Sequence, residues 1–203
     1  MSWIFPLLLF VVFIAVVLCL LAESMWSNAI RFINVVFAAL LATNFWEPTA
    51  RLLESAMKGG SYWWDIVALW VLFALFVTIL QTVTGAISRV NVRFLAIANK
   101  AGGIVFACLT AVVFVCFANF TLHTAPLAEK AFQGGFPSQS SMSPDRQWVR
   151  FASLVSGGSL AHFGKVNQFN GADFNSAYAK RRATLQEQVE SNKGFGGDGT
   201  PAR

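Results

Sequence analysis

Charge is scarce in this sequence of 203 residues: only 12% of the residues are Asp, Glu, Lys or Arg, while 56% are hydrophobic. Soluble domains usually contain about 25% charged and 45–50% apolar residues. A helix in a soluble core also keeps a polar stripe, which the runs at 7–21 and 67–80 lack on every face. The composition therefore argues against a soluble all-α protein and indicates a membrane protein.

Cysteine, histidine and catalytic motifs are also scarce. The three cysteines lie within apolar runs, which is typical of small packing residues rather than of a disulfide framework: Cys19, Cys108 and Cys116. No histidine or carboxylate stands at ligand spacing beside Cys108 and Cys116, and no HExxH, GxSxG or GxxxxGK[ST] motif occurs. His123 lacks an orienting partner nearby in sequence, so we expect a structural role for it. The sequence predicts no catalytic residue, no metal, no cofactor and no enzyme.

Four long apolar runs fill most of residues 1–127. A helix needs about 20 apolar residues to cross a bilayer, since the hydrocarbon layer is about 30 Å thick. The first run lacks the basic start and cleavage site of a signal peptide, so we expect it to be retained. The sequence predicts an all-α membrane protein, with a transmembrane domain at 1–127 and four spans at about 3–21, 28–46, 63–82 and 102–121.

The loops differ in charge. Arg31 follows the first span, and Arg89, Arg93 and Lys100 lie between the third and fourth spans, whereas the opposite side carries fewer cations. Under the positive-inside rule these loops are cytoplasmic. We therefore expect a multi-pass protein of a bacterial inner membrane with both termini outside the cytoplasm.

A few polar residues within or beside the spans are candidates for function: Asp65, Asn34, Arg31 and Arg93. Charged groups inside a bilayer are costly and usually functional. Asp65 also fits a simpler interpretation, because it lies near the interface and the positive end of a helix dipole favours an acid in the first turn.

Small residues recur at every fourth position in two of the spans: Ala38 and Ala42 in the second, and Gly103, Ala107 and Ala111 in the fourth. This spacing lets backbones approach closely. It predicts that the second and fourth helices pack together, or that each packs against a copy in another subunit.

Several segments resemble the colicin V production (CvpA) family of small four-helix inner-membrane proteins. They are RFINVVFA at 31–38, NFWEPTA at 44–50 and NKAGGIVFA at 99–107, while VRF at 92–94 and CFANFTLHTAPL at 116–127 are similar to its planctomycete branch. The chain departs from the family where Asn28 to Arg31 replace an expected glycine and arginine pair, and where Ala107 and Ala111 replace glycines. The resemblance implies a role in colicin V production or export and in envelope homeostasis, with no established catalytic residues.

Residues 128–203 differ in composition from the first part and predict a small, partly disordered extramembrane tail. Ser143-Pro144-Asp145 is typical of a helix start. The helix would lie on the bilayer surface or pack on the membrane domain, with Arg146 and Arg150 towards phosphates, or it would simply pack against the loops. The segments that we expect are a linker at 133–141, helices at about 144–155 and 176–190, and disorder at 193–203. Lys180-Arg181-Arg182 precedes Glu187 and Glu190, and this mixed charge indicates a solvated face. Three cations are too few for a convincing lipid site, and nucleic-acid binding is weaker still.

Two functions fit these features. The first is a membrane scaffold or accessory factor for toxin export and envelope maintenance, with the lipid bilayer and other membrane proteins or itself as partners. The second is a small oligomeric channel or transporter. A pore should show polar groups in register along one helix, yet none lies between Asp65 and Thr78. The pattern therefore favours the scaffold.

Overall fold

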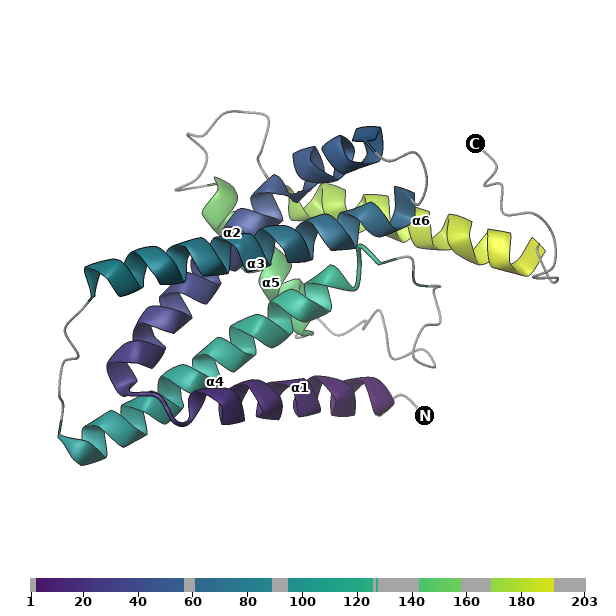
Figure 1. Ribbon diagram of the computed structural model, residues 1–203. Helices are drawn as coiled ribbons and strands as arrows, with labels where there is room; N and C mark the ends of the chain where they lie inside the picture. The colour runs from purple at the N-terminus through teal and green to yellow at the C-terminus, as the bar shows by residue number, and fades with distance from the viewer. Residues whose placement is uncertain are drawn as a thin grey trace.

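The computed structural model describes residues 3–56, 61–88, 95–125, 127, 143–157 and 169–191. Arg93, the linker expected at 133–141 and the disorder expected at 193–203 lie outside these residues. The regular structure of the described ranges is entirely helical (Figure 1). The helices are α1 (Ile4–Leu20), α2 (Met25–Ala56), α3 (Ser61–Ile87), α4 (Ala96–Thr121), α5 (Pro144–Gly157) and α6 (Gly171–Ser191).

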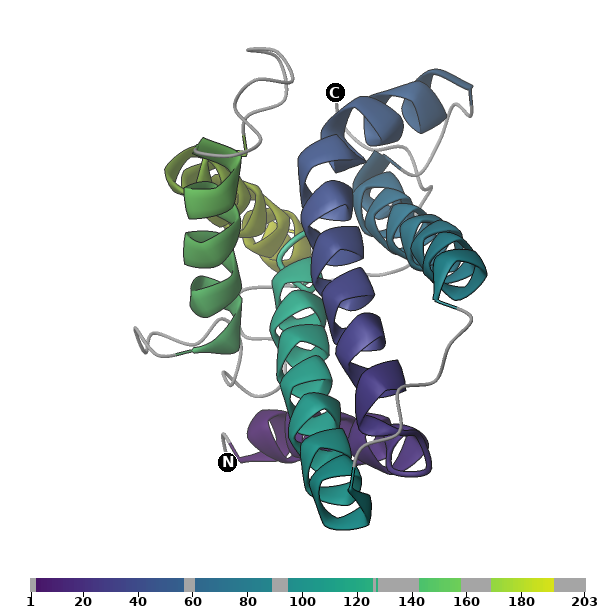
Figure 2. The ribbon, with the colours of Figure 1, turned by 90° about the vertical axis from the view of Figure 1, so that its left-hand side faces the viewer.

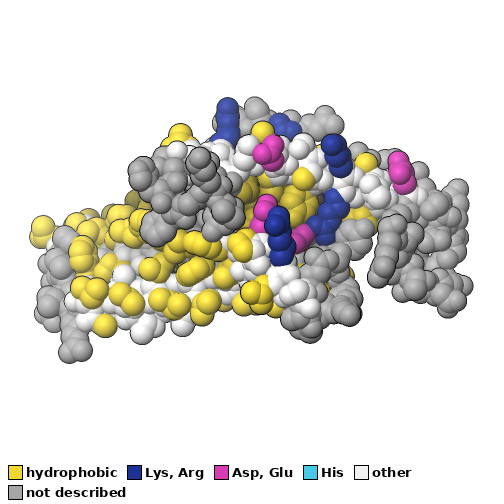
Figure 3. Space-filling view, turned by 90° about the horizontal axis from the view of Figure 1, so that it is seen from above, with side chains coloured by type: hydrophobic (Ala, Val, Ile, Leu, Met, Phe, Trp, Pro, Cys, Tyr) yellow, Lys and Arg dark blue, Asp and Glu magenta, His cyan; other side chains and the backbone are white. Residues whose placement is uncertain are grey.

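Three helices are long and apolar enough to cross a membrane, over Met25–Leu53, Trp63–Ile87 and Ala96–Thr121. The fourth expected span, α1, has 17 residues and is shorter; at 1.5 Å per residue it measures about 26 Å. Figure 3 shows hydrophobic side chains over much of one half of the molecule and charged side chains towards the other half. Val71, Leu75 and Ile79 of α3 are exposed at successive fourth positions. Such faces indicate a membrane-embedded protein.

The second helix continues past the point where the sequence predicted the end of the span. We expected Glu47-Pro48 to end it, but α2 runs through Pro48 to Ala56. Proline removes one backbone hydrogen bond and bends a helix without always ending it. Figure 2 shows the last turns of α2 leaning away from the rest of the helix.

The last helix begins earlier than predicted, at Gly171 instead of about 176. Asn170 supplies the start signal, since its Oδ1 accepts the backbone N–H of Ala172 at 3.1 Å and its Nδ2 donates to Asp173 Oδ2 at 2.8 Å. Asparagine is a favoured residue at helix N-termini because its side chain can bond the free backbone N–H groups there.

The membrane helices alternate in direction, so that the ends of neighbouring helices lie together at the two opposite ends of the bundle. α2 packs on α3 and α4, and α1 packs on α4 (Figure 1). Trp26 Nε1 donates to Ser88 Oγ at 3.0 Å, and the Met25 N–H donates to Asn99 Oδ1 at 2.9 Å. The start of α2, the end of α3 and the start of α4 therefore meet at one end. The start of α3 and the end of α4 lie towards the other end, beside the tail helices.

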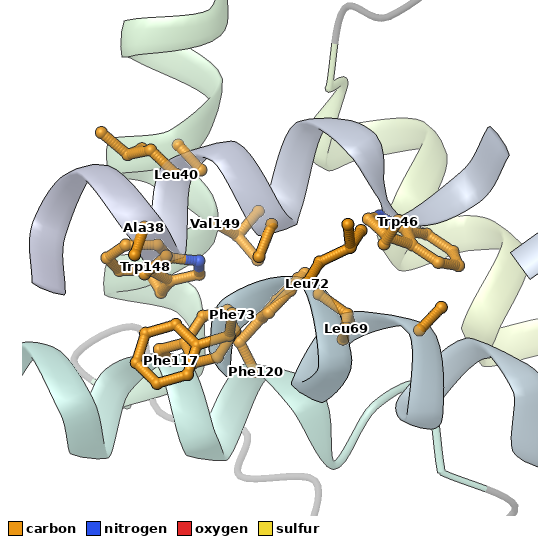
Figure 4. Packing of buried hydrophobic residues seen from close by; sticks show 14 of the residues in the cluster. Ala38, Leu40, Trp46, Leu69, Leu72, Phe73, Phe117, Phe120, Trp148 and Val149 are labelled. Carbon is orange, nitrogen blue, oxygen red and sulfur yellow. The ribbon is translucent and has the colours of Figure 1, made fainter. Parts of the chain in front are cut away.

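An aromatic cluster fills the space between α2, α3, α4 and α5. Phe117 is fully buried and stacks on Phe73 with ring centroids 4.8 Å apart, while Trp70 and Trp148 meet it edge-on at 5.9 Å and 5.7 Å. Figure 4 shows Phe117, Phe73 and Trp148 close together, with Ala38 beside Trp148. Interlocking rings of this kind pack this part of the bundle densely.

The tail helices share this core. Trp148 Nε1 of α5 donates to Thr43 Oγ1 at 3.1 Å. Ser156 Oγ donates to Asn44 Oδ1 at 2.6 Å and accepts the Phe169 N–H at 3.0 Å, joining α5, α2 and the segment before α6. Figure 2 shows α5 alongside α4 and α2. Residues that the sequence assigned to a separate tail are thus packed against the membrane helices.

Candidate functional site

Three buried residues form a hydrogen-bonded chain at the end of α4. His123 follows α4, Asp145 lies in the first turn of α5, and Arg182 belongs to α6. The Nε2 atom of His123 lies 2.8 Å from Asp145 Oδ2, and Arg182 Nη1 lies 2.8 Å from His123 Nδ1. Their side chains are only 3–8% exposed. Together Asp145, His123 and Arg182 form a latch between the tail and the end of α4.

The chemistry of the two partners determines which nitrogen of the His123 imidazole carries the proton. A guanidinium only donates, so His123 Nδ1 accepts from Arg182 and carries no proton. Nε2 then carries the proton and donates it to the Asp145 carboxylate. The ring is neutral and both of its nitrogens are engaged. A histidine in this state has no free nitrogen for acid–base chemistry, so the geometry supports a positioning role.

Asp145 is held ionised by its surroundings. Burial alone would raise the pKa of this carboxyl group, but hydrogen bonds from His123, Ser143 and a backbone N–H outweigh burial and lower the pKa below 3.8. Asn119 Nδ2 also donates to Asp145 Oδ1 at 3.2 Å. The latch therefore contains one anion and one cation, and the two charges offset each other within a buried cluster.

The latch predicts a pH dependence. Because the folded pKa of Asp145 lies below its ordinary value of 3.8, the stability that the carboxylate contributes is fully present above pH 3.8 and is lost as the pH falls through the lowered pKa. The difference in stability between the chain and its Asp145→Asn variant should narrow only below pH 3.8, as measured by detergent-induced unfolding. A difference that was unchanged in strong acid would show that the carboxylate charge plays no part.

A second ionic contact joins α6 to the start of α3. Arg181 Nη1 donates to Asp65 Oδ2, and the Tyr178 hydroxyl donates to the same oxygen at 3.1 Å. Burial raises the pKa of the Tyr178 phenol, and the Asp65 carboxylate raises it further, so the hydroxyl keeps its proton. Asp65, the fifth residue of α3, thus anchors the tail, a role that neither sequence interpretation anticipated.

The solvated face predicted for this mixed-charge segment holds for Lys180 and Glu187 but not for Arg181 and Arg182. Lys180 is exposed, but Arg182 is buried in the latch and Arg181 binds Asp65. A cleft of about 290 Å³ beside this contact is also lined by Glu47 and Arg51, which form an exposed ion pair at 3.7 Å. Acidic and basic groups therefore gather where α2, α3 and α6 meet.

The other polar candidates lie elsewhere. Asn34 Nδ2 donates to Thr84 Oγ1 at 2.8 Å, and Arg31 pairs with Glu23 at 3.3 Å. Thr84 is 19 residues from Asp65 along α3, which corresponds to about 28 Å. The structure thus places Asn34 and Asp65 towards opposite ends of α3.

The small-residue candidates are all buried, in helices that pack together: Ala38, Ala42, Gly103, Ala107 and Ala111. A Cβ at Gly103 would lie 3.3 Å from the backbone oxygen of Glu23. Asn28 Nδ2 donates to the Gly103 and Leu20 carbonyl oxygens, each at 3.0 Å. Gly103 therefore allows the turn between α1 and α2 to approach α4 closely.

Replacing Gly103 by valine is expected to destabilise this approach by about 1–3 kcal/mol, because a branched side chain would overpack a backbone contact. The measurement is the midpoint of detergent-induced unfolding. Gly85→Val is the matched control, since Gly85 also lies in an apolar helix but has nothing within 4 Å of a Cβ. Equal midpoints for the two variants would contradict the prediction.

Sequence reasoning missed the latch because its members are 22 and 59 residues apart. One signal was present. Phe174, Tyr178 and Arg182 recur at every fourth position, which places an arginine on the aromatic face of α6. An arginine on a buried face needs a partner, and the remaining histidines and carboxylates were the candidates.

Comparison with known proteins adds no family to this description. No family model, no curated protein and no solved structure matches the chain. The candidate site is therefore defined by the contacts described above.

Proposed function

We propose that this protein is an integral scaffold or accessory protein of a bacterial inner membrane, which acts through helix contacts in toxin export and envelope maintenance. The observation that carries the proposal is the attachment of both tail helices to the membrane helices by the latch and by the Asp65 contact. A firmly held surface at one end of the helices suits the binding of other membrane proteins. The resemblance to the colicin V production family supplies the expected process.

The packing of the helices favours a scaffold over a channel. The hydroxyl groups of Thr43, Thr78 and Thr110 donate to carbonyl oxygens one turn earlier in their own helices, so their protons are already bound within the helix. Between the Asn34 and Asp65 regions, the buried residues from α2 and α3 include Ala38, Ala39, Leu69, Leu72 and Phe73. Ion conduction along this route would require an opening of the aromatic cluster.

The proposal includes four membrane spans, with α1 as the shortest, and both termini outside the cytoplasm. The Met25 and Asn99 bond supports this arrangement, because it places the turn near Arg31 and the connection near Lys100 at the same end. A 17-residue helix reaches across a bilayer when flanking residues extend to the interface or the bilayer thins locally.

Ion-flux and complementation assays test the scaffold. Liposomes that contain the protein should leak ions no faster than empty liposomes. Expression of the chain in a bacterium that lacks its own colicin V production protein should restore secretion of colicin V, and Asp65→Asn should weaken this rescue. Flux that Asp65→Asn abolishes would instead support the transporter, and failure of the rescue with the protein present in the membrane would contradict the proposed process.

A further inference from the structure

A polar cleft of about 250 Å³ lies between the start of α2 and the end of α3. Both helices are apolar enough to cross a membrane, and these two ends lie together (Figure 1). Trp26 lines the cleft, and tryptophan is enriched where spanning helices meet the headgroups. Two residues singled out in the sequence, Arg31 and Asn34, line it together with Gln81 of α3. In a bilayer the cleft therefore lies at the level of the headgroups.

The lining of this cleft is rich in hydrogen-bond donors. Among the described residues that line it there is one arginine and no carboxylate, and most of the others carry a hydroxyl or amide group. The Ser88 hydroxyl accepts the indole N–H of Trp26 at 3.0 Å, so its own proton is left to donate. Gln81 is exposed and adds the N–H groups of its amide. Such a lining suits an anion with several acceptor oxygens.

Arg31 supplies the positive charge of the cleft. Its Nη2 atom pairs with Glu23 at 3.3 Å, and both side chains are partly open to the surroundings. A guanidinium carries several N–H donors in a planar fork, so this contact leaves others for a second acceptor. Ion pairs with such exposure contribute little stability. A phosphate oxygen can therefore share the Arg31 guanidinium with Glu23 or take its place.

An exposed stripe of α3 leads from the cleft towards the middle of the helix. Ala74, Thr78, Gln81 and Gly85 are all exposed and follow one another at intervals of three or four residues, so they share one face. The Thr78 hydroxyl donates to the Ala74 carbonyl oxygen, which leaves the stripe without a free donor there. A Cβ at Gly85 would have nothing within 4 Å, so the cleft is open at its side. The stripe gives an acyl chain a shallow path away from a headgroup held in the cleft.

We propose that this cleft binds the phosphate-bearing headgroup of one membrane phospholipid, with Arg31, Gln81 and Ser88 as donors to the phosphate oxygens. Arginine is well suited to this role, because its fork of N–H groups makes charge-assisted bonds to phosphate. The acyl chains lie outside the cleft along the exposed face of α3. The inference goes beyond the proposed function, and it depends on the membrane placement of the helices and not on a role in export.

Native mass spectrometry of the full chain tests this site. The protein is purified in mild detergent and equilibrated with palmitoyl-oleoyl phosphatidylglycerol, and we expect one tightly held lipid per chain. Arg31→Gln should weaken retention roughly fivefold, the usual contribution of one cation near an anionic lipid. Arg51→Gln is the matched control, since it also removes an arginine from an exposed ion pair but lies away from the cleft. It should leave retention unchanged.

Glu23→Gln separates binding from a merely structural role of the ion pair. This variant removes the acid that competes for Arg31, so it should retain the lipid at least as tightly as the unmodified chain. A structural role would make Glu23→Gln and Arg31→Gln lose the lipid alike. That result would overturn the proposal.

Filling the cleft is an independent test. Gly85→Leu should be accommodated without overpacking, and its side chain should displace the lipid. Ala86→Leu, on the next exposed residue, lies outside the lining and should not. The proposal is overturned if these two variants retain the lipid equally, if Arg31→Gln retains it like the unmodified chain, or if no lipid is retained. Displacement of the lipid by soluble glycerol 3-phosphate would also overturn it, because the ligand would then be a free phosphate ester.

Discussion

Replacing Asp145 by asparagine is expected to release α5 and α6 from the membrane helices, at a cost of about 3–5 kcal/mol. The variant keeps the size of the side chain and one acceptor oxygen for His123 Nε2. It removes the anion of the latch, whose charge offsets that of the buried Arg182 guanidinium. Hydrogen exchange of the protein in nanodiscs should show faster exchange in α5 and α6 while the centres of α3 and α4 stay protected.

The control for this change is Asp173→Asn. Asp173 also lies in the first turn of a tail helix, but it is exposed and accepts only the Asn170 side chain at 2.8 Å among its described side-chain contacts. The amide hydrogens of the Asp173→Asn variant should exchange at almost the same rates as those of the unmodified chain. A triple variant with Asp145→Leu, His123→Phe and Arg182→Met should be much more stable than Asp145→Asn, because it removes all the buried charges together. Normal protection of α5 in Asp145→Asn would disprove the latch.

The membrane helices follow from the sequence because their signal is local. A run of apolar residues about 20 long demands a helix in lipid, whichever residues it later touches. The start of α5 has a local signal too, since proline fixes a helical φ angle and Asp145 favours a first turn. Helix ends were harder to predict. Pro48 bends α2 without ending it, and the Asn170 side chain starts α6 earlier than its pattern of charges suggested.

The latch and the Asp65 contact could not be read from the sequence because they depend on tertiary structure. Asp65 and Arg181 are 116 residues apart. A carboxylate in the first turns of a helix has a sufficient local explanation in the helix dipole, so its distant partner leaves no trace in the local pattern. The sequence predicted a structural role for His123 because no orienting partner lies nearby in the sequence. It has two orienting partners, and these partners occupy the nitrogen atoms that catalysis would need.

The latch and an apolar groove of about 650 Å³ between α2, α4 and α5 meet in α5. Asp145 binds His123 from one side of the helix, while Gln147 and Phe151 line the groove on another side. The contacts that hold α5 against α4 thus also determine the shape of this groove. Two sets of interactions, one ionic and one apolar, therefore depend on the placement of a single amphipathic helix.

Replacing Phe117 by alanine is expected to cost about 3–5 kcal/mol of stability, the usual range for a buried phenylalanine. Phe117 is fully buried and contacts rings from both α3 and α5, so its loss opens a cavity between three helices. In lipid, helices associate through close packing rather than through exclusion of water, and a cavity removes that packing directly. Neighbouring rings are rigid, so they cannot close the space by rotating side chains alone.

The midpoint of unfolding in a titration with sodium dodecyl sulfate measures this loss, and Phe10→Ala is the matched control. Phe10 lies in the equally apolar α1 but is exposed to the surroundings of the protein, so its truncation should change the midpoint little. Phe117→Ala should also loosen α5, because Trp148 loses the ring that it meets edge-on at 5.7 Å. Equal midpoints for the two variants would show that the aromatic cluster is loosely packed. The case against a channel would then lose its main support, because that case requires rings that cannot move apart.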